Sequence, residues 1–369
     1  MKATATVSPD FWVGRKVLVT GHTGFKGAWL TAWLRQMGAA CEGISLPPPH
    51  TLPSLFNLIG LDDEISSHFG DIRDFEWLKS AFEEAEPEII FHLAAQSIVR
   101  LSYAKPLQTL STNVMGTANL LELARESPGL RAIVVVTSDK CYENQEWFWG
   151  YREIDRVGGA DPYAASKACA ELVASCYRQA FFPPDSLAGH GVGIASARAG
   201  NVIGGGDWAP DRLVPDLIRS FHNNDVAAIR RPSSVRPWQH VLDCLSGYLI
   251  LAQRLVQDPP VFSGSWNFGP IADDERAVAW VADRITQLWG EGAAWISVPD
   301  QGPPEATKLR LDCSKARTEL GWRPTWDAEE AIIRTVRWYR SWSAGTRSPN
   351  LRDATDSDLS DFLREHSDS

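Results

Sequence analysis

The sequence lacks the features that mark secreted, metal-binding and membrane proteins. Its six cysteines are scattered, without a C-x-x-C pair or a nearby histidine cluster, so neither a zinc site nor a disulfide framework is indicated. No apolar run approaches the roughly 20 residues of a membrane span, and residues 1–9 lack the apolar stretch of a signal peptide. We therefore expect a cytoplasmic protein with reduced thiols and no bound metal.

Positive charge is also scarce relative to negative charge. The chain has 36 Lys and Arg against 46 Asp and Glu, and its formal net charge is −10. This sign disfavours nonspecific binding to nucleic acid or to an anionic membrane. A phosphorylated substrate would therefore need a local cluster of arginines.

What the first 200 residues do have is an alternation of short apolar strands with helical patterns. The expected strands are residues 16–20, 41–46, 88–93, 131–137 and 192–197, and the expected helices are residues 28–37, 73–85, 112–125 and 161–181. This order predicts an α/β fold, a Rossmann-type doubly wound parallel sheet with right-handed crossovers.

The regular alternation fades beyond Gly204, where Gly, Pro, Trp and Arg become common. We expect a dinucleotide-binding domain over residues 11–200, to which segments from about 235–270 return. Residues 201–340 would form mainly a smaller C-terminal lobe that binds the substrate. Residues 345–369 are a polar tail that we expect to be frayed.

Three glycines directly follow the first expected strand, in the segment Gly21-His-Thr-Gly24-Phe-Lys-Gly27. Glycine permits a tight bend, close approach of backbone to a pyrophosphate, and close packing of helix on strand. The next helix would present unpaired N–H groups to the phosphates. Such triplets also occur as ordinary turns, but the flanking elements favour dinucleotide binding. The residues expected at the cofactor are Gly21, Thr23, Gly24, Phe25, Gly27, Asp71, Ile72, Leu93, Ala94, Ala95, Thr137, Tyr163 and Lys167.

The end of the second expected strand has no carboxylate, although an NAD-specific site usually binds the ribose hydroxyls there. Ser45 lies in that region, and Glu42 lies too early in the strand. This position therefore leaves the choice between NAD and NADP open.

Tyr163 and Lys167 are four residues apart in an expected helix, so they share one face. A lysine beside a phenol favours the phenolate and is expected to lower the tyrosine pKa from ~10 towards neutrality, which suits a base. A surface tyrosine with an unrelated lysine is the simpler explanation in isolation. The nucleotide-binding pattern upstream favours a catalytic pair.

Ser138, Asp139 and Lys140 follow the strand expected at residues 131–137. Ligands of open α/β sheets bind at the carboxyl ends of strands, so these side chains should face the site. Ser138 would hydrogen-bond a sugar hydroxyl, and Asp139 and Lys140 would supply an acid and a base. A solvated ion pair at a strand end is the alternative.

Together these motifs resemble the extended short-chain dehydrogenase/reductases, and within them the nucleotide-sugar 4,6-dehydratases of the CDP-glucose branch. The resemblance runs from about Phe11 to about Trp338. Further stretches that carry it are Ala94-Ala-Gln-Ser-Ile-Val-Arg100, Arg198-Ala-Gly-Asn-Val-Ile-Gly-Gly-Gly-Asp-Trp208, Arg236-Pro-Trp-Gln-His240 and Trp266-Asn-Phe-Gly-Pro270.

The resemblance implies that CDP-glucose becomes CDP-4-keto-6-deoxyglucose through NAD-mediated oxidation at C4, loss of water across C5 and C6, and hydride return to C6. Tyr163, assisted by Lys167 and Ser138, would take the C4 hydroxyl proton. Lys140, which stands where most sugar dehydratases have Glu, would take the C5 proton, and Asp139 would protonate the departing hydroxyl. Ser97 and Asp243-Cys244 depart from the usual Pro and Glu-Pro of this branch.

The resemblance also implies a homodimer formed through residues 112–125 and 161–181.

The residues expected at the substrate are Gln96, Arg100, Arg198, Asn201, Arg212, Arg230 and Arg236. Arginine suits a diphosphate because its guanidinium binds two oxygens at once. At least one of these arginines is instead expected to pair with Asp207, Asp211 or Asp216.

Two other functions remain open on the sequence alone. A nucleotide-sugar epimerase or reductase would need Tyr163 and Lys167 but not the acid and base at 139 and 140. A non-catalytic nucleotide sensor would tend to lose the tyrosine or the lysine. The presence of all four residues favours dehydration.

Overall fold

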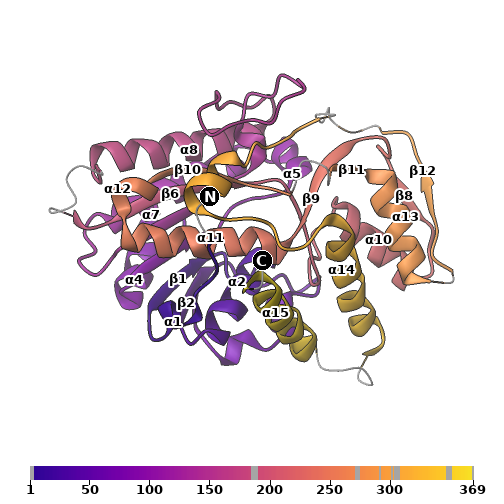
Figure 1. Cartoon of the computed structure of the whole chain (residues 1–369), viewed down its shortest axis with the longest axis horizontal. Helices are drawn as coiled ribbons and strands as arrows, with labels where there is room; N and C mark the ends of the chain where they lie inside the picture. The colour runs from indigo at the N-terminus through magenta and orange to yellow at the C-terminus, as the bar shows by residue number, and fades with distance from the viewer. Residues whose placement is uncertain are drawn as a thin grey trace.

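Seven parallel strands form the main sheet of the computed structural model, which describes residues 4–183, 190–270, 275–290, 292–300, 302, 308–345 and 351–367 (Figure 1). The strand order is β10-β6-β5-β4-β1-β2-β3, so the order reverses between β1 and β4. This arrangement confirms the expected doubly wound fold. The strands are β1 (Lys16–Thr20), β2 (Ala40–Ser45), β3 (Ser66–Phe69), β4 (Ile89–His92), β5 (Ala132–Val136), β6 (Gly193–Ala199) and β10 (Gly264–Phe268).

Helices cover both faces of this sheet, which explains why its central strands are continuous apolar runs. Side chains alternate between the two layers along each strand. Val17 and Val19 pack in the layer of α2 (Phe25–Gln36) and α11 (Val241–Gln257). Leu18 packs in the opposite layer, which is formed by α4 (Phe75–Ala85), α7 (Gly116–Ala124) and α8 (Pro162–Ala180).

A smaller lobe lies beside the carboxyl ends of the strands, at the right of Figure 1. A three-stranded sheet of β11 (Glu275–Ala277), β9 (Val235–His240) and β7 (Asn201–Ile203) leads into it. The lobe contains α10 (Leu213–His222), α13 (Val278–Trp289), α14 (Ala328–Ser343) and the parallel pair β8 (Ala227–Ile229) and β12 (Trp295–Ser297).

The C-terminal tail is polar, but for its described residues 351–367 the expectation that it is frayed is wrong. Residues Leu351–Ser367 form helix α15, which buries Leu359 and Phe362. Its acidic residues pair with α14: Arg334 contacts Asp358 at 3.3 Å and Asp361 at 2.6 Å. Charged side chains therefore hold this helix in place where apolar ones are few.

No helix among the described residues is long and apolar enough to cross a membrane. The remaining elements are short. The short elements are α1 (Pro9–Trp12), α3 (Leu55–Leu58), η1 (Leu61–Asp63), α5 (Val99–Ala104), α6 (Pro106–Leu110), η2 (Ser111–Met115), η3 (Asp139–Cys141), α12 (Pro259–Phe262) and η6 (Ala316–Leu320).

Candidate active site

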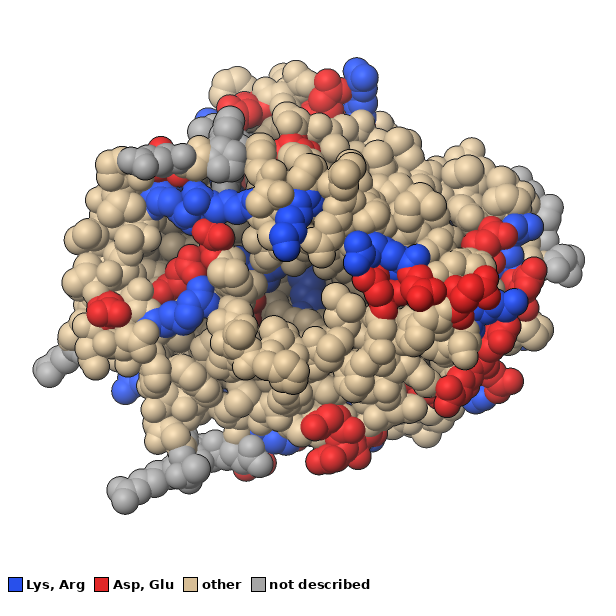
Figure 2. Space-filling model, turned by 180° about the vertical axis from the view of Figure 1, so that it is seen from behind, with Lys and Arg blue, Asp and Glu red and all other residues tan. Residues whose placement is uncertain are grey.

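A cleft of about 1260 Å³ opens where the carboxyl ends of β1, β4 and β5 meet the smaller lobe. Figure 2 shows a hollow near the middle of the face opposite to that of Figure 1, with basic side chains inside it. The walls of the cleft come from the glycine turn, the segment after β5, the start of α8, and lobe segments around residues 199–217 and 227–236. Ligands of doubly wound sheets bind at this place.

The glycine turn after β1 has no room for side chains. Gly21 has φ of +76°, and a Cβ there would lie 2.8 Å from the Ala94 nitrogen. A Cβ on Gly27 would lie 2.1 Å from the Gly21 carbonyl oxygen. The turn is therefore a cradle of bare backbone before the N-terminus of α2, which fits the pyrophosphate of a dinucleotide. The expected cofactor residues that line the cleft are Gly21, Thr23, Gly24, Phe25, Gly27, Asp71, Ile72, Leu93, Ala94, Ala95, Thr137, Tyr163 and Lys167.

The end of β2 contributes a hydroxyl to this cradle. Ser45 lines the cleft, and its Oγ lies 2.7 Å from Thr23 Oγ1. Glu42 is bonded to His68 Nε2 at 3.1 Å and does not line the cleft. Asp71, after β3, does line it, and its carboxylate is held by Arg73, which lowers its pKa.

Ser138, Asp139 and Lys140 lie at the end of β5 and line the cleft. The Ser138 hydroxyl donates to Asp139 Oδ1 at 2.9 Å and accepts from the Lys140 amide at 3.2 Å, so it caps the short helix η3. Burial raises the pKa of the Asp139 carboxyl, although the charges of Lys140 and Arg236 oppose the rise. Burial therefore makes the Asp139 carboxyl a weaker acid than a carboxyl in water.

Tyr163 and Lys167 line the same cleft from the first turns of α8. The expectation that the tyrosine pKa falls towards neutrality is wrong for the protein by itself: burial raises the pKa of Tyr163 to about 12, while a hydrogen bond with Ser138 acts in the opposite direction. Burial and the charge of Lys26 lower the pKa of Lys167 to about 8. The Lys167 ammonium donates to the Val136 carbonyl at 3.2 Å.

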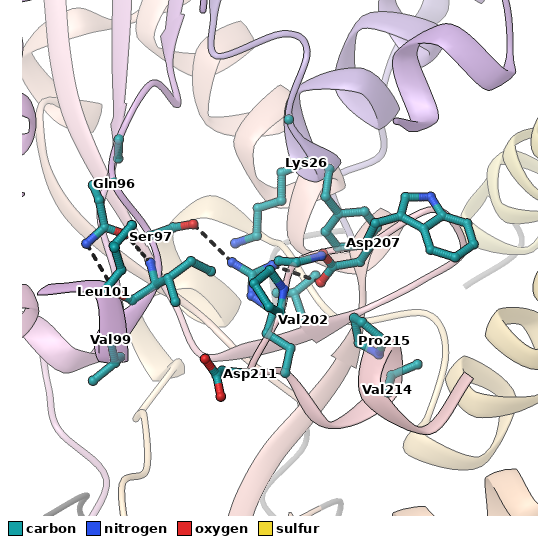
Figure 3. A pocket seen from close by; sticks show the side chains of 18 of the residues that line it. Lys26, Gln96, Ser97, Val99, Leu101, Val202, Asp207, Asp211, Val214 and Pro215 are labelled. Carbon is teal, nitrogen blue, oxygen red and sulfur yellow. Dashed lines mark hydrogen bonds and ion pairs between the residues drawn. The ribbon is translucent and has the colours of Figure 1, made fainter. Parts of the chain in front are cut away.

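Several arginines of the cleft are paired with aspartates, as the sequence leads us to expect for at least one of them. Arg212 contacts Asp207 at 2.8 Å and donates to Ser97 Oγ at 3.1 Å from across the cleft (Figure 3). Arg230 pairs with Asp211 at 3.2 Å. The expected substrate residues that line the cleft are Gln96, Arg100, Asn201, Arg212, Arg230 and Arg236.

Arg198 does not belong to this group, so its prediction as a substrate residue is wrong. The side chain is buried away from the cleft, where it pairs with Glu171 at 2.7 Å and donates to Tyr142 Oη at 2.7 Å. The reason is the alternation along β6: Ile194, which packs in the layer of α8, lies on the same face as Arg198.

Two residues of the site, Lys26 and Asp300, have no clear signal in the sequence. Lys26 lies in the first turn of α2 and lines the cleft, with its Nζ 3.5 Å from Tyr248 Oη. Asp300 lines it from the loop after β12 and contacts Arg100 at 3.2 Å.

Gln96, an expected substrate residue that lines the cleft, is fixed by hydrogen bonds within the protein. Its backbone N–H donates to Asn113 Oδ1 at 2.8 Å. The Gln96 side chain is also occupied, by Ile98 and Thr109.

Comparison with known proteins places the chain among nucleotide-sugar enzymes. Residues 18–335 match the family model described as GDP-mannose 4,6 dehydratase. A CDP-glucose 4,6-dehydratase of Salmonella typhimurium is 54% identical over 339 residues, which cover 92% of this chain and 94% of the relative. A dTDP-D-glucose 4,6-dehydratase of Bos taurus is 26% identical over 352 residues, with 92% of both chains covered.

Solved structures share the fold. A dTDP-glucose 4,6-dehydratase from Bacillus anthracis in complex with NAD superposes with a TM-score of 0.74 at 21% identity, over 90% of this chain and 99% of that one. A UDP-glucose 4-epimerase from Thermotoga maritima with UDP-glucose gives 0.75 at 20% identity, over 88% and 98%. At these identities the likeness establishes the fold alone.

Proposed function

The chain belongs to the GDP-mannose 4,6 dehydratase family, and from this membership we propose that it is an NAD-dependent CDP-glucose 4,6-dehydratase. It is a hydro-lyase that removes water from the hexose of CDP-glucose and forms CDP-4-keto-6-deoxyglucose. The choice of cytidine is supported by the 54% identity to the Salmonella typhimurium enzyme over nearly the whole chain.

The observation that carries the proposal is the placement of Asp139 and Tyr163 in the wall of one cleft. Dehydration needs a group that protonates the departing C6 hydroxyl, and an epimerase does not. Asp139 suits this task because its raised pKa favours the protonated carboxyl and Ser138 holds it in position.

Each remaining step uses a residue of this chain. Tyr163 takes the proton of the C4 hydroxyl, with Ser138 orienting that hydroxyl and Lys167 favouring the phenolate. When bound, NAD supplies a positive charge that further favours the phenolate, and it carries hydride from C4 to C6. The C4 ketone makes the C5 proton acidic, and Lys140 removes this proton. Asp139 donates its proton to the leaving hydroxyl, and Lys140 gives its proton back to C5 as hydride returns to C6, which completes the 4-keto-6-deoxy product.

The lobe supplies the groups that bind the diphosphate. Arg212, Arg230 and Arg236 line the cleft, and a guanidinium group can bind two phosphate oxygens at once. Asn201, at the start of β7, offers an amide beside them. These residues place the hexose towards Tyr163 and the nucleoside towards the lobe.

The enzyme is a cytoplasmic homodimer in this proposal. Apolar side chains are exposed on helices that pack together beside the sheet: Leu107 is 80% exposed, Met115 55% and Leu172 57%. Exposed apolar side chains of this kind favour association with a second copy. The six cysteines are free thiols, as in reducing compartments. Leu172→Glu should yield monomers in analytical ultracentrifugation, and an unchanged oligomer would contradict this interface.

Turnover of a panel of nucleotide sugars tests the proposal. The purified protein with NAD should convert CDP-glucose to a product lighter by one water, which mass spectrometry detects. Base should then induce the absorbance of a 4-keto sugar. dTDP-, GDP- and UDP-activated hexoses are the controls for nucleotide choice. Formation of an epimer without loss of water would sink the proposal.

A further inference from the structure

A buried ion pair lies behind the wall of the cleft. Glu171 of α8 and Arg198 of β6 are joined at 2.7 Å, and their side chains are 3% and 4% exposed. Burial raises the pKa of Glu171, but the charge of Arg198 and the hydrogen bonds from Arg198, Thr137 and Ser196 outweigh burial, so the Glu171 pKa is lowered. Neither residue has a role in the reaction steps described above.

The Glu171 carboxylate holds the end of the catalytic strand. Its Oε1 accepts from Thr137 Oγ1 at 2.5 Å, and its Oε2 accepts from Ser196 Oγ at 2.7 Å. Thr137 is the residue before Ser138, so the contact fixes the backbone from which Ser138 and Asp139 project into the cleft.

The same carboxylate acts on Lys167. Tyr163, Lys167 and Glu171 are spaced by four residues and share one face of α8. Lys167 bonds the carbonyl of Val136, the strand residue next to Thr137. The charge of Glu171 raises the pKa of Lys167, against the effects of burial and of Lys26 on α2.

Two further titratable groups face Lys167. Cys141 of η3 acts on the Lys167 pKa in the same direction as Glu171. His92 of β4 is buried and stays neutral, with its pKa lowered to about 3. Glu171 is therefore the nearby group that holds a full negative charge at neutral pH and favours the ammonium.

We propose that Glu171, kept ionised by Arg198, is a positioning residue for the reaction, which fixes the Thr137–Ser138 strand end and keeps Lys167 charged beside Tyr163. The inference rests on the proposed function for the roles of Ser138, Tyr163 and Lys167. A purely structural ion pair would stabilise the fold but would not set the charge of Lys167.

Competitive labelling of the full-length enzyme with acetic anhydride, read by mass spectrometry across pH, measures the pKa of Lys167 without turnover. Glu171→Gln should lower this pKa by about one unit. The alkaline limb of kcat for CDP-glucose should move to lower pH by the same amount, because the charged lysine is lost earlier as pH rises. Glu171→Asp retains the charge and should restore both. Asp358→Asn, which removes a buried carboxylate paired with Arg334 far from the cleft, should move neither.

Glu171→Gln leaves Arg198 buried without its partner, so this variant can fail to fold. The double variant Glu171→Gln with Arg198→Met removes both charges, and it should show the same fall in the Lys167 pKa. An unchanged Lys167 pKa in either folded variant would overturn the inference. Failure of the proposed function would show differently, as a wild-type enzyme that does not turn over CDP-glucose.

Discussion

Asp139 and Glu171 lie on opposite sides of the same strand end, and both carboxyl groups are buried. Asp139 accepts one side-chain hydrogen bond, from Ser138, and its pKa is raised. Glu171 accepts from Thr137 and Ser196 and pairs with Arg198, and its pKa is lowered. Burial is common to both, so the donors and the paired cation decide in which direction the pKa of each carboxyl moves.

The two carboxyl groups therefore serve different tasks, and each is bonded to one of two adjacent residues that directly follow β5, Thr137 and Ser138. The hydroxyl of Ser138 turns to the cleft, where a neutral acid is needed, and the hydroxyl of Thr137 turns to the interior, where a fixed charge is needed. If the two environments were exchanged, the acid of the cleft and the fixed charge of the interior would both be lost.

Asp139→Asn breaks the cleft side of this comparison and has the largest expected effect. Asparagine can still accept from Ser138 but cannot protonate the departing hydroxyl, so dehydration should fall by about 10²–10⁴-fold. Oxidation at C4 would continue, and reduced nicotinamide should accumulate in stopped-flow absorbance. Glu42→Gln, outside the cleft, is the matched control. Near wild-type turnover in Asp139→Asn would remove the acid from the scheme.

Arg198→Met breaks the interior side. It leaves the Glu171 carboxylate buried without its cation, so the free energy of unfolding in urea should fall by about 3–5 kcal/mol. Lys79→Met removes the exposed pair of Lys79 with Glu83 and should change stability by less than about 1 kcal/mol. Equal effects of the two substitutions would show that the interior pair contributes no more than a surface pair.

The stability of Asp139→Asn sharpens the comparison, because its sign should be opposite to that of Arg198→Met. The raised pKa means that the folded state binds the Asp139 proton more tightly than the unfolded chain does, so stability is lost as pH rises above the unfolded value of 3.8. Asparagine removes this loss and should stabilise the protein at neutral pH by about 1.4 kcal/mol for each unit of pKa elevation.

Urea unfolding of wild type and Asp139→Asn at a series of pH values measures this gain. It should shrink as the pH falls and vanish well below 3.8, where the carboxyl is protonated in both states. A variant that is less stable than wild type at neutral pH would show that the environment favours the carboxylate.

Ser97→Ala extends the comparison to a contact at the rim of the cleft. The lost hydrogen bond between Ser97 and Arg212 is worth about 1 kcal/mol, so KM for CDP-glucose should rise about fivefold, with kcat unchanged. Ser97→Thr keeps the hydroxyl and serves as the control. A fall in kcat without a change in KM would place Ser97 in the chemistry and not in binding.

Five strands of the main sheet could be predicted because each is a short apolar run, whereas β3 and β10, which are more polar, are not among the expected strands. The helix predicted at 28–37 begins earlier, at Phe25, since the glycine turn itself leads into it. The glycine turn and the residues 138–140 line the cleft as expected, because both follow strands whose carboxyl ends meet at one edge.

The rest depends on contacts between distant segments. Arg198 follows a run of strand residues and resembles a strand-end ligand, but the alternation along β6 turns it to α8. Glu171 lies four residues after Lys167 on α8, but its local sequence does not show that Arg198 pairs with it. Helix α15 has few apolar residues, and its ion pairs with Arg334 cannot be inferred from local sequence.

The cleft arginines already hold anions of the protein itself. Arg212, Arg230 and Arg100 contact Asp207, Asp211 and Asp300, so an arriving diphosphate must exchange with aspartates and does not enter a bare basic groove. Salt screens the ion pairs of these arginines with the aspartates as well as those with the diphosphate. Binding of the nucleotide sugar should therefore depend only weakly on ionic strength. Free inorganic phosphate would have to break the same ion pairs without the contacts of a hexose and a nucleoside, which makes it a poor competitor.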